Sequence, residues 1–270
     1  MSAVCFAAVA TVALAASSSD VFPRAFARGT LVVGVPFLAP EAAAGAKVRT
    51  PERLDDVMAA RLGEALGLPV KLVQLDAAQR LTALKQGEVD LVIADRSQAA
   101  DEPAAPAASG GNIIGTGYTA RPQAVIRSDT KLRHWQDVKG LTACMSTAAV
   151  QAQALATQWG AVVRTYRVPS DALVAVREGA CDVGLVDDIA WTPLMKFPEW
   201  KKFSATLDSQ GPRTERVWVV AEDVATQAWL TDTMAQWRRE GAVAAMVDKW
   251  ARDVAFDVYL DQEVPDCHGG

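Results

Sequence analysis

Short apolar runs alternate with helical stretches along this chain, and this alternation is the feature that most restricts its fold. Residues 31–35, 91–94 and 183–186 are continuous apolar runs with the length and composition of strands buried on both faces. Residues 54–66 carry apolar side chains at helical spacing, and Gly67 follows them as a stop signal. Strands that alternate with helices build mostly parallel sheets, so the sequence predicts an α/β fold.

The same reasoning assigns the remaining elements of the chain. Residues 99–111 are rich in Ala, Pro and Gly, and this composition predicts a loop. We expect further strands at residues 70–75, 124–126, 142–145, 162–166 and 217–221, further helices at 80–85, 148–159 and 170–178, and two final amphipathic helices marked by 230–237 and 243–250.

The order strand, helix, strand, short helix, strand occurs twice, and each copy runs into an acidic residue. The first copy reaches Asp95 and the second reaches Asp187. Ligands of parallel sheets bind beyond the carboxyl ends of the strands. Two similar halves with these ends facing each other would form a cleft, which is a common place for a small ligand. The sequence therefore predicts that both carboxylates face such a cleft.

The composition is that of a globular protein, and the charge argues against a nucleic acid partner. Half of the 270 residues are hydrophobic and 22% are charged. The formal net charge of −5 repels phosphate backbones. The chain has two histidines, no cysteine pair with metal-ligand spacing and no phosphate-binding glycine loop. We therefore expect no metal, no cofactor and no catalytic residue.

The N-terminus predicts export. Residues 1–16 are small and apolar, and Ala13-Leu14-Ala15 has the pattern of a cleavage site, although no Lys or Arg precedes the run. A buried N-terminal helix is the alternative. Removal of residues 1–16 as a signal peptide leaves Cys144, Cys181 and Cys267, so at most one disulfide can form, and the sequence does not determine its pairing.

Several short motifs, taken together, resemble a known family. Each is weak alone, but they occur in family order from residue 28 to residue 250, and the stretch 79–91 is the most specific of them. The chain resembles the family 3 extracellular solute-binding proteins of ABC importers, which include polar amino acid receptors. The motifs are ARGTLVVGV at 27–35, LDDV at 54–57, QRL with GEVDL within 79–91, VKG at 138–140, GACDV at 179–183 and DKW at 248–250.

This resemblance implies a two-lobed periplasmic-binding-protein fold of type II. Each lobe would be a mostly parallel sheet flanked by helices, with two hinge crossovers near residues 117–123 and 212–217. Lobe 1 would comprise residues 28–117 plus 218–262, and lobe 2 residues 118–217. The family closes on its ligand by a hinge motion. The resemblance also implies a periplasmic monomer that captures a small polar solute, amino acid-like, and delivers it to a membrane permease.

The resemblance also suggests ligand-binding residues in this sequence. Asp187 corresponds to the acid that pairs with a ligand ammonium, and its neighbour Asp188 is the residue that could exchange roles with it. Ser146 and Thr147 stand where a strand turns into a helix, and free N–H groups there suit a carboxylate. Phe37 follows the first strand, where relatives place an aromatic platform. Capping or packing is the structural alternative for each of them.

One departure from the family lies after Asp95. Amino acid receptors carry a Thr-x-x-Arg signature there, whose Arg holds the ligand carboxylate, but residues 95–102 read DRSQAADE. Arg96 or Arg121 would have to substitute, and a solvated surface position is the alternative for both. An acid at position 95 favours a cationic or hydroxyl-rich ligand. Asp55, near a helix start, is expected to be structural.

Two other functions remain open on the sequence. Degenerate ligand motifs also fit an accessory or sensor protein that serves a partner enzyme or receptor. Some relatives on this fold are dehydratases, although His134 is predicted in a loop and His268 in the tail, which leaves little acid–base chemistry in the expected cleft.

Overall fold

The structure is a computed structural model. It describes residues 20–38, 44–45, 47, 49–51, 54–98, 111–221 and 223–261. The expected signal peptide, Cys5, Cys267, His268 and residues 99–110 of the expected loop lie outside these ranges.

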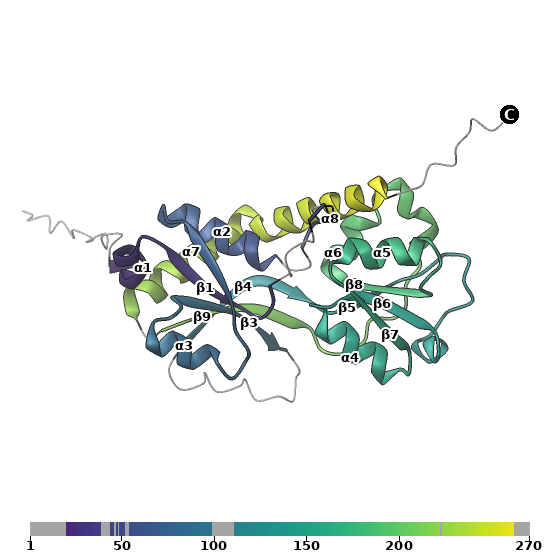
Figure 1. Cartoon of the computed structure of the whole chain (residues 1–270), viewed down its shortest axis with the longest axis horizontal. Coiled ribbons are helices and arrows are strands. Elements are labelled where there is room, and N and C mark those ends of the chain that lie inside the picture. The colour runs from purple at the N-terminus through teal and green to yellow at the C-terminus, as the bar shows by residue number, and fades with distance from the viewer. Residues whose placement is uncertain are drawn as a thin grey trace, which may run out of the picture.

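Two sheets lie side by side along the long axis of the molecule, each flanked by helices (Figure 1). This arrangement confirms the predicted two-lobed α/β fold. The five-stranded sheet has the order β2-β1-β3-β9-β4, with β1 Leu31–Val35, β2 Val70–Gln74, β3 Leu91–Ser97, β4 Asn112–Ala120 and β9 Thr214–Val220. The four-stranded sheet has the order β5-β8-β6-β7, with β5 Pro122–Val125, β6 Thr142–Ser146, β7 Val162–Tyr166 and β8 Val183–Asp187.

Each sheet contains three adjacent parallel strands, as the repeated pattern predicts. In the first sheet β1 lies between β2 and β3, and in the second β6 lies between β7 and β8. The helices of the two lobes are α1 Pro23–Arg28, α2 Asp55–Leu66, α3 Arg80–Gln86, α4 Val150–Gln158, α5 Pro169–Arg177, α6 Asp188–Leu194, α7 Val224–Glu240 and α8 Ala242–Leu260, with 3₁₀ turns η2 Trp135–Val138 and η3 Pro198–Phe203.

The connections between the lobes are strands that pair antiparallel with these parallel cores. β9 pairs antiparallel with β3 and with β4, and β5 pairs antiparallel with β8. The chain leaves the five-stranded sheet at Ala120, enters the other sheet at Pro122 and returns at Thr214. Residues 118–120 and 214–217, which the sequence analysis assigned to lobe 2, thus lie in strands of the lobe 1 sheet.

The Gly-x-x-Asp sequence that occurs once in each lobe makes the same contact twice. Gly87 is the C-cap residue of α3 and has a φ of 72°, and Gly179 follows the C-cap of α5 and has a φ of 78°. Both angles lie in the left-handed region that favours glycine. Three residues later, Asp90 accepts a hydrogen bond from the N–H of Val32 at 2.7 Å, and Asp182 accepts one from Thr142 at 2.8 Å. Each Asp thereby fixes the start of one strand against the next.

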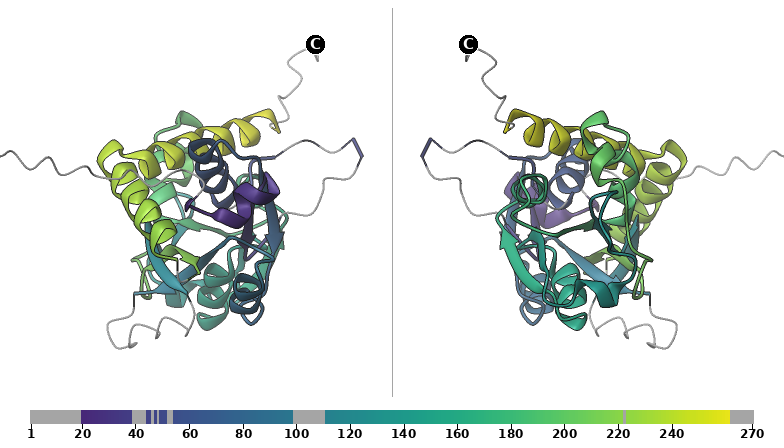
Figure 2. Two further views of the ribbon diagram at one scale, coloured as in Figure 1. Left: turned by 90° about the vertical axis from the view of Figure 1, so that its left-hand side faces the viewer. Right: turned by 90° about the vertical axis from the view of Figure 1, so that its right-hand side faces the viewer.

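A single buried cluster of apolar side chains runs through both lobes on one face of the sheets. It includes Leu31 and Trp218 of lobe 1, Leu173 and Leu194 of lobe 2, and Trp250 of α8. The helix α8 reaches across from one lobe to the other and packs on α5 and α6 (Figures 1 and 2). This segment is predicted to belong to lobe 1, but α8 contacts elements of both lobes.

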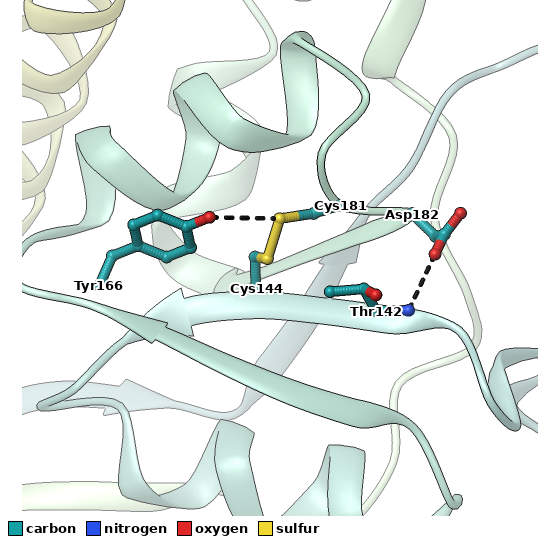
Figure 3. The surroundings of a disulfide bond; sticks show 5 residues. All are labelled: Thr142, Cys144, Tyr166, Cys181 and Asp182. Carbon is teal, nitrogen blue, oxygen red and sulfur yellow. Dashed lines mark hydrogen bonds between the residues drawn. A yellow bond between two sulfur atoms is a disulfide. The ribbon is translucent and has the colours of Figure 1, made fainter.

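Lobe 2 contains a disulfide between Cys144 of β6 and Cys181, two residues before β8 (Figure 3). Their Cα atoms are 6.0 Å apart, and the hydroxyl of Tyr166 lies 3.8 Å from the sulfur of Cys181. The sequence left this pairing open because a bridge that involves Cys267 was also possible. Among the described residues, no helix has the length and apolar character needed to cross a bilayer.

Candidate functional site

A cavity of about 390 Å³ lies between the two lobes, and both contribute to its wall. The lobe 1 side comes from the ends of β1, α3, β3, β4 and β9, and the lobe 2 side from the start of α4 and the end of β8. Its wall consists of Pro36, Phe37, Arg80, Asp95, Tyr118, Ala120, Thr147, Ala148, Ala149, Val150, Gln151, Ala152, Leu185, Val186, Asp187, Thr214 and Arg216. The strand ends therefore meet at an interlobe cavity, as the sequence predicts.

Asp187 is the last residue of β8 and stands at the N-cap position of α6. The hydroxyl of Tyr118, on the lobe 1 strand β4, donates a hydrogen bond to its Oδ2. Nη2 of Arg216, on β9, lies 3.8 Å from the same oxygen. The side chain keeps 33% of its exposure, so this lobe 2 carboxylate contacts lobe 1 and still faces the cavity.

Asp95 brings the second predicted carboxylate to the wall from the opposite lobe. It lies in β3, directly opposite Arg216 in the antiparallel register with β9. Its Oδ1 is 3.9 Å from Nε of Arg216, and its side chain is 35% exposed. The two carboxylates thus approach one guanidinium from different lobes. Their role in binding stays a prediction.

Arg216 is the central residue that the sequence analysis missed. Its side chain is 8% exposed, and its guanidinium carbon lies 4.2 Å from the centre of the Tyr118 ring. Nη1 is 3.5 Å from Oδ1 of Asp55, the first residue of α2, whose side chain is 4% exposed. Each of the three guanidinium nitrogens therefore faces a different carboxylate. The only signal in the sequence is a lone Arg at the start of an apolar strand.

The turn between β6 and α4 contributes Thr147 but not Ser146 to the wall. Ser146 is buried, and its Oγ accepts a hydrogen bond from the N–H of Ala148 at 3.2 Å. This is a contact within the turn, because the N-cap position of α4 is Ala149. The hydroxyl of Thr147 donates to the carbonyl of Tyr166 at 3.0 Å. Gln151, one turn further on, donates to the hydroxyl of Thr214 and so links α4 to the lobe 1 strand β9.

Phe37 lines the cavity after β1, whereas neither of the two substitute arginines does. Arg96 forms an ion pair with Glu215 on the neighbouring strand. Nε of Arg121 lies 3.5 Å from Asp188, in the crossover between the lobes. The guanidinium groups in the wall are instead those of Arg216 and Arg80, the first residue of α3. Position 80 belongs to the family-like stretch, but its side chain was not predicted to bind.

The wall combines carboxylates, guanidinium groups, hydroxyls and one phenyl ring, which is the chemistry of a site for a small charged molecule. His134 lies at the start of η2 and is not among the residues of this wall. In the ranges that the structure describes, no group of three or more His, Cys, Asp or Glu is arranged to hold a metal ion.

Comparison with solved structures gives many matches in fold. A substrate-binding protein of an amino acid ABC transporter has a TM-score of 0.51 at 20% identity, with 82% of this chain and 98% of that chain covered. The amino acid ABC transporter substrate-binding protein AbpA from Streptococcus pneumoniae, bound to L-arginine, has a TM-score of 0.54 at 14% identity, with coverage of 87% and 98%.

A third match is an ancestral amino acid-binding protein described as a precursor of cyclohexadienyl dehydratase. Its TM-score is 0.55 at 17% identity, with 85% of this chain and 98% of that chain covered. No protein-family profile and no curated protein matches the sequence. At these identities the likeness shows the fold, which is that of the two-lobed substrate-binding proteins.

Proposed function

We propose that this chain, which has the fold of amino acid-binding proteins of ABC transporters, captures a small polar, amino acid-like solute between its lobes for an ABC importer. The observation that carries the proposal is the interlobe cavity with Asp95 of lobe 1 and Asp187 of lobe 2 in one wall. A carboxylate in a closed cavity forms a strong, charge-assisted hydrogen bond to an ammonium group. Arg80 and the start of α4 offer donors for a carboxylate on the same solute.

Export to the periplasm is part of the proposal. It is supported by the signal-like residues 1–16 and by the disulfide between Cys144 and Cys181. Disulfides form and persist in oxidising compartments and are rare in the cytosol. The solved structures with this fold include substrate-binding proteins of amino acid transporters, one of them bound to L-arginine.

The direct test is a thermal-shift screen of the purified protein with amino acids, polyamines, sugars and organic acids. A solute that binds the folded state selectively raises the melting temperature. We expect at least one amino acid-like solute to do so, and Asp187→Asn to remove that shift while circular dichroism stays unchanged. Asp129→Asn is the matched control, because Asp129 is a surface carboxylate of lobe 2 with 67% exposure.

Two results would contradict the proposal. One is a screen in which none of the amino acids raises the melting temperature. The other is an Asp187→Asn variant that keeps the full shift, because a ligand in this cavity would contact that carboxylate.

Binding without turnover is the expected behaviour, although one neighbour is described as a precursor of a dehydratase. The solute recovered from the protein after overnight incubation should have an unchanged mass. A product lighter by one water would favour an enzyme on this fold over a receptor.

A further inference from the structure

A second cavity, separate from the interlobe cavity, lies on the α8 side of the molecule (Figure 1). Its volume is about 440 Å³, which is within the range of small-molecule pockets. Its wall combines the segment before α2, the first turn of that helix and one face of α8 from Met246 to Asp257. None of the described residues lines both cavities, so the two walls are separate.

Hydrogen bonds tie the segment before α2 to α8 and keep this wall in shape. The N–H of Thr50 donates to Oδ2 of Asp257 at 2.9 Å, and Nη1 of Arg49 donates to the carbonyl oxygen of the same residue at 3.1 Å. Nε1 of Trp250 donates to the carbonyl oxygen of Pro51 at 2.8 Å. A wall that is held in this way reduces the ordering cost that a ligand has to offset.

Apolar side chains give this cavity a surface for the body of a ligand. Leu54, Met246 and Trp250 are buried, whereas Val57 is 38% exposed and Phe256 is 59% exposed. Phe256 therefore leaves an accessible phenyl ring at the wall. Covering such a ring with an apolar group is favourable, and the face of the ring attracts a cation.

Asp56 supplies the same wall with a carboxylate that no Lys or Arg of the described ranges contacts. It lies in the first turn of α2, is half-buried and accepts a hydrogen bond from the N–H of its neighbour Val57 at 2.8 Å. The cations of the wall are engaged with other acids, Lys249 with Asp253 and Arg49 with two carboxylates outside the wall. A cation on a ligand would therefore meet an unshared carboxylate at Asp56.

The surroundings of this carboxylate favour the arrival of a positive charge. Burial raises the pKa of the Asp56 carboxyl more than the hydrogen bond from Val57 lowers it, and the charge of Asp55 adds to the rise. The charged form is thus disfavoured in the cavity as it stands. An opposite charge within contact distance would stabilise the carboxylate and offset the cost of its burial.

We propose that this second cavity is a binding site for a small organic cation, in which an amine group contacts Asp56 and an apolar body covers Phe256. An ammonium group donates a strong, charge-assisted hydrogen bond to a carboxylate. A free small molecule is the occupant that a cavity of about 440 Å³ accommodates. The site goes beyond the proposed function and does not rest on it, because the walls of the two cavities are separate.

The experiment is isothermal titration of the full chain with three probes that share a phenyl ring and differ in charge, namely 2-phenylethylamine, 2-phenylethanol and 3-phenylpropionate. The wild type should bind the amine with a Kd of about 1 mM or tighter. The alcohol and the carboxylate should bind at least about tenfold more weakly, because they place no cation at Asp56.

Two variants of the wall should weaken the binding of 2-phenylethylamine. Asp56→Asn keeps an oxygen that accepts the hydrogen bond from Val57 but removes the charge, so the affinity should fall about tenfold. Phe256→Ala removes the accessible ring and should lower the affinity about fivefold. Unchanged circular dichroism verifies that both variants are folded.

The matched controls are Asp248→Asn and Tyr259→Ala. They change a carboxylate with 50% exposure and a ring with 58% exposure on α8, both outside the described wall of the cavity. Both controls should leave the affinity for the amine unchanged. Asp187→Asn should do the same, because Asp187 belongs to the interlobe cavity.

A wild type that does not bind 2-phenylethylamine, or that binds 3-phenylpropionate equally well, would overturn this inference. An amine affinity that neither Asp56→Asn nor Phe256→Ala changes would overturn it as well. Loss of amine binding with Asp187→Asn alone would place the amine in the interlobe cavity and also contradict it. These results leave the proposed function standing, because the thermal-shift screen tests that function separately.

Discussion

Asp187 and Asp188 are neighbours in the chain, yet their side chains have different surroundings. Asp187 faces the cavity with Tyr118 and Arg216. Asp188 turns into the crossover region, where Arg213 donates to both of its carboxylate oxygens and Arg121 lies 3.5 Å away. At the last residue of a strand and the first of a helix, consecutive side chains point in different directions, so Asp187 lines the cavity and Asp188 does not.

At Asp188 we predict a loss of stability without a loss of binding. Asp188→Asn removes a charge that two arginines share, at 16% side-chain exposure, and leaves both of them short of a partner. The free energy of unfolding should fall by about 1–3 kcal/mol, as measured by urea denaturation. Solute affinity should stay within a few-fold of the wild type. Loss of binding with unchanged stability would contradict this division between the two acids.

The residues of the cavity were partly predictable from sequence, for a physical reason. Asp95, Asp187 and Phe37 follow or end strands that their own apolar pattern reveals, so local reasoning places them at the strand ends. Arg216 reaches the cavity only because β9 pairs with β3, which places residue 216 opposite residue 95, 121 positions earlier in the chain. Nothing in the local sequence encodes that pairing, so the local sequence points to Arg96 and Arg121 as substitutes and not to Arg216.

At the scale of elements, the strands with continuous apolar sequence were predictable and β4 was not. Residues 112–120 read NIIGTGYTA, with two glycines that weaken the strand signal. They form a strand because β9 pairs with them on one side, with an irregularity between Gly115 and Thr119. The predicted lobe boundary at residue 117 lies inside β4, because this strand was not predicted. The first crossover begins only where β4 ends, at Ala120.

The strands β6 and β8 carry the lobe 2 half of the site, and the disulfide holds them together. Cys144 lies in β6, two residues before Ser146 at the end of that strand. Cys181 lies two residues before β8, and β8 ends at Asp187. The hydrogen bond that the N–H of Thr142 donates to the carboxylate of Asp182 lies beside the disulfide (Figure 3). The covalent bond therefore links β6, which Thr147 follows, to the segment that leads into β8, which ends at Asp187.

For this element pair we predict that Cys144→Ala combined with Cys181→Ala lowers the free energy of unfolding by about 4 kcal/mol, since the bond closes a loop of 37 positions. Urea denaturation of the oxidised wild type and of the double variant measures the difference. Dithiothreitol should bring the wild type to the stability of the double variant and leave the variant itself unchanged. Equal stability of the two oxidised proteins would contradict the prediction.

At the scale of the whole molecule, α8 makes the two lobes share one core. Trp250 and Val254 belong to the same buried cluster as Leu31 of lobe 1 and Leu194 of lobe 2. At the C-terminal end of α8, Arg49 pairs with Asp261 and also lies 3.4 Å from Asp171 near the beginning of α5. Lobes connected only by two strands could unfold separately, but a shared core couples them.

We therefore predict a single cooperative unfolding transition for the wild type in differential scanning calorimetry. Val258→Asp buries a charge in the last turn of α8, where Val258 is 2% exposed, and should lower the melting temperature and separate the transition into two. Leu260→Asp is the control two residues away, because Leu260 is 53% exposed and should have little effect. Two transitions in the wild type would show that α8 does not couple the lobes.

The two sides of the molecule differ, because α8 covers the junction between the lobes on one side only. The helix bridges the lobes on one side, whereas α3 and the start of α4, which supply Arg80 and Thr147 to the cavity, lie on the other (Figure 1). Under the proposed function, a solute would enter and leave past these two shorter helices. A permease that receives the solute would then contact this side of the molecule, with α8 facing away.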